Sequence, residues 1–282
     1  MFLSTDPPGL TQRAIPVSTG VTLNVVERPG SGAPVICLHG LWAWWRVWRP
    51  LLPPGPGSFV GRPVLLPDLR GHGESGKPVD GYSLDSAAAD IVALVREQGI
   101  ERFTLAGHSL GALVALLVAA AVPERVESML LEDPPLPLPI GDDAAELDGA
   151  WLDFATTAMA LYEIKHQPAP VIAAALQERV PALTAADAEE DAQCLALVAD
   201  GVFEALLNVE EVTLLPPGTT LPMPTLVFRA GDPADRMLGD RGVEHLQELL
   251  PRMRLETIPG TGHWVLGSNP TAYRAAVAAF FE

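Results

Sequence analysis

The chain has 282 residues, 48% of them hydrophobic, and a mean hydropathy of +0.23, a composition that supports a large folded core and excludes a disordered chain. Its formal net charge of −17 disfavours anionic partners, so we expect no binding to nucleic acid or to a membrane surface. The sequence lacks a signal-peptide pattern, an apolar run of the roughly 18 residues that span a bilayer, and a cysteine pattern typical of disulfides. We therefore expect a cytoplasmic protein.

Short strand-like runs alternate with helix-like runs through most of the chain. The strand-like runs are nearly continuously apolar and lie at 21–26, 34–38, 63–67, 102–106, 126–131, 224–228 and 254–258. The helix-like runs lie at about 84–98, 110–121, 240–250 and 270–281. Apolar strands separated by helices are typical of a sheet that is buried on both faces. We therefore predict an α/β fold with a mostly parallel sheet.

The segment 134–222 interrupts this alternation. It is rich in alanine, leucine and acidic residues at helical spacing, and the proline-rich runs PPLPLP and LPPGTTLPMP flank it. We predict a core formed by 1–133 and 223–282, with 134–222 inserted as a helical cap. An insertion at this place in an α/β sheet is positioned to act as a lid, although a satellite helical layer is the alternative.

The run TLAGHSLGALVALL carries the strongest chemical signal. Residues 107–111, Gly-His-Ser-Leu-Gly, match the pattern G-x-S-x-G directly after a predicted strand and at the start of a predicted helix. A sharp turn at this point would strain the backbone of Ser109, and the flanking glycines leave room for the turn. The N-terminus of the helix then offers N–H groups to a developing oxyanion. We interpret Ser109 as a nucleophile.

Together with this motif, three further segments resemble the α/β-hydrolase fold superfamily over nearly the whole chain. They are VICLHGLWAWWRVWRPLL, LLPDLRGHGESGKP (65–78) and IPGTGHW (258–264), and the four motifs occur in the order of the family. The resemblance implies an α/β-hydrolase fold with a helical cap inserted after the sixth strand, at 126–131. The elbow carries a serine where dehalogenases and epoxide hydrolases carry aspartate, which argues against both chemistries.

The resemblance also implies roles for individual residues. His263 is the expected base, because an imidazole titrates near neutral pH and can pass a proton to the leaving group. The backbone N–H groups of Leu110 and Leu41 are the expected oxyanion hole. Asp68 is expected to be structural, as it is in the family after the fourth strand.

The third member of the triad has four candidates. Asp133, at the end of the strand 126–131, lies 24 residues beyond Ser109 (133 − 109), which resembles family members with their acid at that strand. Asp232, after the strand 224–228, is the main alternative, although the stretch AGDPAD places it out of register with the usual Gly-x-x-Asp. Glu132 and Asp235 are the remaining candidates. We prefer Asp133 and expect Glu132 to have no catalytic part.

The aromatic-rich run after His39 suggests where a substrate binds. We expect Trp42, Trp45 and His39 to line the substrate pocket, and Trp48 to pack into the core. The tandem tryptophans together with EDPP resemble short segments of hydrolases that open macrocyclic lactones such as zearalenone.

These observations predict a serine hydrolase that cleaves a carboxylic ester or lactone through an acyl-enzyme. No phosphate loop, metal-ligand cluster or dinucleotide motif is present in the sequence, so no metal or cofactor is expected. The expected partner is a small-molecule substrate, and a homodimer is possible. The alternatives are a carbon–carbon bond hydrolase, a cofactor-free perhydrolase and a slow small-molecule receptor on the same fold.

Overall fold

A computed structural model describes residues 6–59, 61–136, 149–180, 183–207 and 214–282. Its eight strands form one sheet in the order β1-β2-β4-β3-β5-β6-β7-β8, in which β3 to β8 are parallel to one another and β1 and β2 are antiparallel to their neighbours. The strands are β1 (Thr11–Pro16), β2 (Thr22–Arg28), β3 (Val35–Leu38), β4 (Val64–Pro67), β5 (Phe103–His108), β6 (Val126–Glu132), β7 (Thr225–Ala230) and β8 (Met253–Ile258).

Helices cover both faces of this sheet. On one face are α1 (Leu84–Glu97), α2 (Leu110–Ala121) and α7 (Asp240–Leu249); on the other are the 3-10 helix η1 (Trp45–Leu51), α8 (Val265–Ser268) and α9 (Pro270–Phe281). Successive strand residues enter opposite cores, as Ile36 packs with α1 and α2 whereas Cys37 packs with η1 and α9. This two-sided burial explains why the strands are continuously apolar, and it confirms the predicted fold class.

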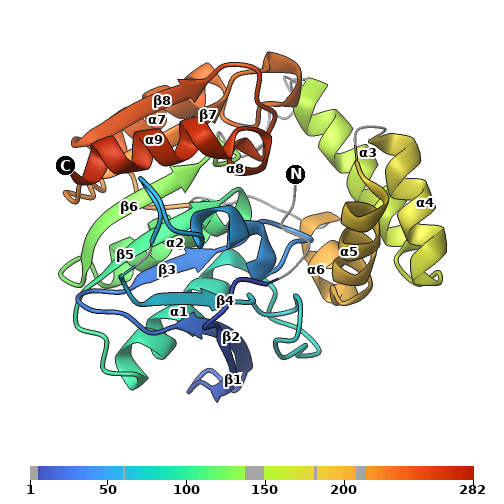
Figure 1. Cartoon of the computed structure of the whole chain (residues 1–282), viewed down its shortest axis with the longest axis horizontal. Helices are drawn as coiled ribbons and strands as arrows, with labels where there is room; N and C mark the ends of the chain where they lie inside the picture. The colour runs from blue at the N-terminus through green and yellow to red at the C-terminus, as the bar shows by residue number, and fades with distance from the viewer. Residues whose placement is uncertain (1–5, 60, 137–148, 181–182, 208–213) are drawn as a thin grey trace.

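Among the described residues between β6 and β7 lie four helices, and Figure 1 shows them together at one side of the sheet. They are α3 (Gly149–Ile164), α4 (Ala169–Arg179), α5 (Ala185–Ala196) and α6 (Asp200–Leu207). They share a separate hydrophobic cluster, against which Leu41, Trp42 and Tyr82 of the core pack. The boundaries of the predicted cap at 134–222 stay a prediction, and its residues 137–148, 181–182 and 208–213 lie outside the described part of the chain.

The inserted helices are attached to the sheet by polar contacts as well. The Arg49 guanidinium of η1 donates to Glu190 of α5 at 2.7 and 3.0 Å, and the Ala199 N–H donates to the Gly71 carbonyl at 2.7 Å. Both core partners follow the carboxyl ends of parallel strands, β3 and β4. The helices therefore cover that edge of the sheet, where ligands bind in α/β folds. Within the described ranges, every helix is too short or too polar to cross a bilayer.

Candidate active site

Ser109 lies in the sharp turn between β5 and α2. Its backbone has φ 51° and ψ −120°, a conformation that a residue with a side chain rarely adopts. Neighbouring glycines make the turn feasible, because a Cβ atom on Gly107 would lie 2.4 Å from the Gly111 carbonyl oxygen, and one on Gly111 would lie 2.1 Å from that of Leu38. The Ser109 N–H donates to the Glu132 carbonyl at 2.9 Å and fixes the turn to β6. The local geometry is that of a nucleophile elbow.

Asp133 is the carboxylate that meets His263. Its Oδ2 atom accepts a hydrogen bond from Nδ1 of His263 at 2.7 Å, and the Asp133 side chain is fully buried. Backbone N–H groups also donate to this carboxylate, from Met237 at 2.9 Å, Ala230 at 3.2 Å and Leu238 at 3.3 Å. These donors fix the carboxylate at the end of β6. A buried, fixed carboxylate of this kind can orient the imidazole and stabilise its cation.

The two candidate acids after β7 lie elsewhere. Asp232 is exposed, and its carboxylate accepts the Ala234 N–H at 3.0 Å, so it caps the short helix η3 (Pro233–Asp235). Asp235 does reach the histidine loop, but through the backbone, because its Oδ2 atom accepts the His263 N–H at 3.2 Å. The geometry therefore favours Asp133 over both of them as partner of the imidazole.

The ring of His263 lies beside the elbow. Its centroid is 4.9 Å from that of His108, the residue before Ser109. Among the described contacts, Ser109 Oγ and His263 do not form a hydrogen bond, and such bonds commonly tighten only when substrate binds. Gly40 also lies next to the serine, because a Cβ atom on Gly40 would lie 3.1 Å from that of Ser109. Leu110, the first residue of α2, directly follows Ser109, and Leu41 directly follows Gly40. Both residues predicted to form the oxyanion hole are therefore close to the serine in the fold.

Two of the three residues expected in the substrate pocket are buried in the core. His39 is fully buried, where Nδ1 donates to the Gly40 carbonyl at 2.7 Å and Nε2 accepts the Leu69 N–H at 2.8 Å. Burial lowers the pKa of His39 to about 4, so this ring is a neutral brace for the loop. Trp45 packs in the core with η1 and α9. His39 and Trp45 are thus buried, whereas Trp42 is half-buried against the inserted helices, and the lining of the substrate pocket by these three residues stays a prediction.

Asp68 joins three segments below the site. Its carboxylate accepts hydrogen bonds from the Asn24 side chain at 2.8 Å, the Trp45 N–H at 2.9 Å and the Glu74 N–H at 3.0 Å. Because these partners come from β2, η1 and the loop after β4, the geometry agrees with the expected structural role.

Glu132 has a part that the sequence did not reveal. It is fully buried, and its Oε1 atom accepts the Leu266 N–H at 2.8 Å, which fixes the start of α8 just after His263. Burial raises the pKa of Glu132 to about 8. The ring atom Nδ1 of His108 lies 3.7 Å from the same carboxyl oxygen, while burial lowers the pKa of His108 well below its usual value. The only sequence signal for this role was the place of Glu132 beside Asp133.

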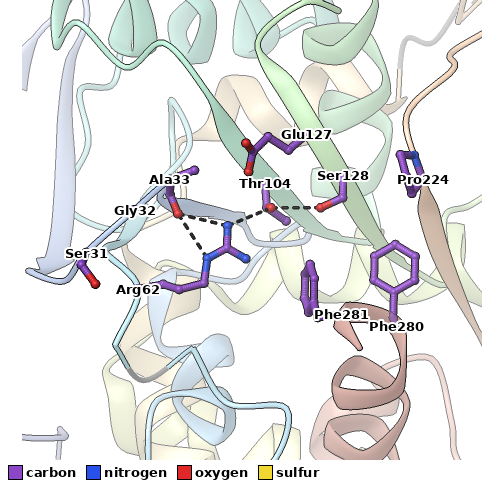
Figure 2. Close-up of a pocket in the computed structure, with 10 residues that line it drawn as sticks. All are labelled: Ser31, Gly32, Ala33, Arg62, Thr104, Glu127, Ser128, Pro224, Phe280 and Phe281. Carbon is purple, nitrogen blue, oxygen red and sulfur yellow. Dashed lines mark hydrogen bonds between the residues drawn. The ribbon is translucent and has the colours of Figure 1, made fainter.

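A hollow lies at the edge of the sheet where the parallel strands begin. This open cavity of about 490 Å³ is lined by residues near the starts of the parallel strands, among them Arg62, Thr104 and Ser128, and by Phe280 and Phe281 of α9 (Figure 2). Its polar groups bind one another, since Arg62 donates to Thr104 at 3.1 Å and the hydroxyls of Thr104 and Ser128 lie 3.0 Å apart. None of the predicted catalytic residues lines it.

Curated relatives match this chain mostly over its parts. It is 36% identical over 104 residues to the soluble epoxide hydrolase of Corynebacterium sp., covering 37% of this chain and 35% of the relative. It is 37% identical over 113 residues to the 2-(acetamidomethylene)succinate hydrolase of Mesorhizobium japonicum, covering 40% and 39%. The sn-1-specific diacylglycerol lipase of Mus musculus matches more extensively, at 25% identity over 95% of this chain and 86% of the lipase. The chain thus spans well under half the length of the first two relatives.

Solved structures share the whole architecture. An epoxide hydrolase from Bacillus megaterium superposes with a TM-score of 0.77 at 19% identity, over 95% of this chain and 99% of the enzyme. The N-formylmaleamic acid deformylase from Pseudomonas putida superposes with a TM-score of 0.73 at 20% identity, over 95% and 100%. At these identities the likeness concerns the fold alone. The alpha/beta hydrolase fold family matches residues 33–270, which is most of the sequence. The chain belongs to the alpha/beta hydrolase fold family.

Proposed function

We propose that this protein is a serine hydrolase that cleaves a carboxylic ester or a lactone. The observation that carries the proposal is the 2.7 Å hydrogen bond between Asp133 and His263, set beside a serine in a strained strand-to-helix turn. Free serine is a weak nucleophile, and a base that a buried carboxylate orients is the usual means of activating it.

The proposed reaction has two halves. His263 takes the proton of Ser109 Oγ as the oxygen attacks the carbonyl carbon, and the N–H groups of Leu41 and Leu110 stabilise the oxyanion. The tetrahedral species collapses, the carbonyl–alkoxide bond breaks, and His263 gives the proton to the departing alcohol. His263 then takes a proton from water as the water oxygen attacks the acyl carbon. The bond between the acyl carbon and Ser109 Oγ breaks, His263 returns the proton to Oγ, and the acid is released. With a lactone, the alcohol and the acid remain parts of one product.

The names of the relatives divide between two chemistries. Epoxide hydrolases stand among them, but Ser109 occupies the elbow, and an acyl-transfer mechanism uses a serine there. The lipase hydrolyses an acyl bond by name, which supports acyl transfer. The helices α3–α6 are proposed to act as the cap of this site, because they cover the carboxyl edge of the sheet near Leu41 and Trp42.

The test is turnover of p-nitrophenyl acetate, p-nitrophenyl butyrate and a panel of lactones of different ring size, compared between the wild-type chain and Ser109→Ala. We expect ester hydrolysis by the wild type, loss of turnover in the variant, and labelling of Ser109 by a fluorophosphonate. Absence of both turnover and labelling would rule the proposal out. Cleavage of a vinylogous diketone, or perhydrolysis with hydrogen peroxide, in preference to esters would move the assignment to the corresponding alternative. Labelling with negligible turnover of all substrates would favour a receptor.

A further inference from the structure

The loop after β3 contains an unusual turn. The Ala43 N–H donates to the Gly40 carbonyl at 3.3 Å, and Trp42, the third residue of the turn, has φ 57°. A positive φ at the third position is typical of a type II turn, where glycine or asparagine normally occurs. A bulky residue with a positive φ is strained, and it persists only when its surroundings hold it.

The inserted helices supply those surroundings. The Trp42 ring stacks on Phe203 of α6, with centroids 5.5 Å apart and planes inclined by 14°. Phe203 is itself fully buried and is supported by Tyr162 of α3, at a centroid distance of 5.3 Å. A stacked aromatic pair contributes stability beyond the area that it buries, so this contact offsets part of the strain of the turn.

A second contact holds the backbone of the turn. The Cys194 thiol of α5 donates to the Trp42 carbonyl at 3.1 Å. Cys194 is buried, and burial raises the pKa of its thiol well above the usual value, so the sulfur keeps its proton and remains a donor. Two inserted helices therefore contact Trp42 of the core. Helix α6 contacts the Trp42 ring, and α5 contacts the Trp42 backbone carbonyl.

The turn that contains Trp42 lies next to Ser109, the proposed nucleophile. Gly40 is so close to the elbow that a Cβ atom on it would lie 2.8 Å from the His108 ring and 3.1 Å from the Ser109 Cβ atom. The Leu41 N–H belongs to the Gly40–Leu41 peptide, the first peptide of the same hydrogen-bonded turn that contains Trp42. If Trp42 relaxes from its positive φ, the whole turn changes, and Leu41 passes the change on to the peptide that carries this donor. Oxyanion donors act only within a narrow distance range.

We propose that Phe203 and Cys194 are positioning residues that hold the Leu41 N–H of the oxyanion hole in its productive orientation, acting through Trp42. The inference rests on the proposed function, because it assigns a purpose to the oxyanion donor. If the inference is right, turnover requires that α5 and α6 pack against the core. In that position they hold the turn at Trp42, and when they move away the turn relaxes.

The experiment compares Phe203→Leu and Cys194→Ala with the control Ile172→Val, which trims a fully buried side chain of the same helical cluster. The readouts are kcat and KM for p-nitrophenyl butyrate and the inhibition constant of phenylboronic acid, which forms a tetrahedral adduct with an active serine. We expect Phe203→Leu to lower kcat by about 10- to 100-fold and to weaken the boronic acid by a similar factor, with KM changed less than about threefold. Cys194→Ala should lower kcat by about 3- to 10-fold, and Ile172→Val should leave it unchanged.

Several results would overturn the inference. A rise in KM at constant kcat would make Phe203 a wall of the substrate pocket, and equal losses in Ile172→Val would make the effect one of general packing. A crystal structure of Phe203→Leu gives a readout that is independent of turnover: we expect Trp42 to leave positive φ, and an unchanged turn contradicts the inference. If Phe203→Leu does not fold, Cys194→Ala with normal kcat contradicts it. A wild type that neither turns over esters nor is labelled at Ser109 refutes the proposed function instead.

Discussion

Glu132 and Asp133 are adjacent in the sequence and hold the two sides of one loop. Asp133 binds the ring of His263 at 2.7 Å, and Glu132 binds the N–H of Leu266, three residues further along, at 2.8 Å. The end of β6 therefore fixes both the imidazole and the backbone that follows it.

Asp133→Asn should lower kcat for p-nitrophenyl esters on the order of 10⁴-fold, because an amide cannot stabilise the imidazolium and favours the wrong tautomer. The substitution is a clean one: Asp133 has φ 42°, which asparagine tolerates well. Asp232→Asn is the matched control, and it should change kcat by less than about threefold since Asp232 only caps η3. The reverse ranking in steady-state kinetics would transfer the role of triad acid to Asp232.

Glu132→Gln should flatten the pH dependence of stability. The folded chain keeps the proton of Glu132 up to a pKa of about 8, whereas an unfolded glutamate loses it near the model value of 4.5. Between these values the folded state binds more protons, so this group lowers the free energy of unfolding as pH rises, by up to about 1.4 kcal/mol per pH unit. Urea unfolding at pH 5 and pH 8 measures the difference.

Glutamine has no titratable proton. The free energy of unfolding of Glu132→Gln, relative to that of the wild type, should therefore rise from pH 5 to pH 8. Glu101→Gln, at an exposed position, is the control and should show no such trend. Parallel pH profiles for wild type and Glu132→Gln would show that the carboxyl is ionised in the fold at both pH values.

Asp235→Ala should reduce kcat by about tenfold, much less than Asp133→Asn. Its carboxylate holds the His263 N–H at 3.2 Å, and its loss lets the loop drift without removing the partner of the imidazole. Asp235→Asn keeps an oxygen acceptor and should recover most of the rate. A loss in Asp235→Asn as large as in Asp133→Asn would mean that the charge of Asp235 acts directly on the histidine.

Asp68→Ala should lower the free energy of unfolding by about 3 kcal/mol or more, because three donors that converge on a buried carboxylate lose their acceptor. The kcat of the folded fraction should fall far less than in Asp133→Asn. Thermal unfolding and kinetics on the same sample separate the two effects. Unchanged thermal stability with a severe loss of kcat would place Asp68 in the catalytic machinery.

The sequence predicted the buried elements well, because a sheet covered on both faces needs continuously apolar strands. The predicted helices at 84–98 and 110–121 agree with α1 and α2 to within one residue. Strand β1 was missed because it is an edge strand whose residues are mostly exposed, so it has no apolar run. The 3-10 helix η1 was missed since its tryptophans and Pro50 carry no helical period.

The site was only partly predictable. The prediction of Ser109 rests on a local motif, and neighbouring residues determine local backbone geometry. The choice between Asp133 and Asp232 depends on how the loop after β8 bends towards β6, a contact between residues 130 positions apart. Trp42 and Trp45 are the same residue type within one run, yet the turn directs one to the inserted helices and the other to the core.

The triad acid candidate and the start of the insertion are almost the same place in the chain. Three residues after Asp133, Leu136 forms an isolated parallel bridge with Leu238, whose N–H also binds the Asp133 carboxylate. A chimera that exchanges the inserted helices with those of another family member should therefore be spliced after Leu136. Splicing before Leu136 would remove the bridge between Leu136 and Leu238 that helps to align Asp133. The chimera would then lose activity, whichever substrate the new helices admit.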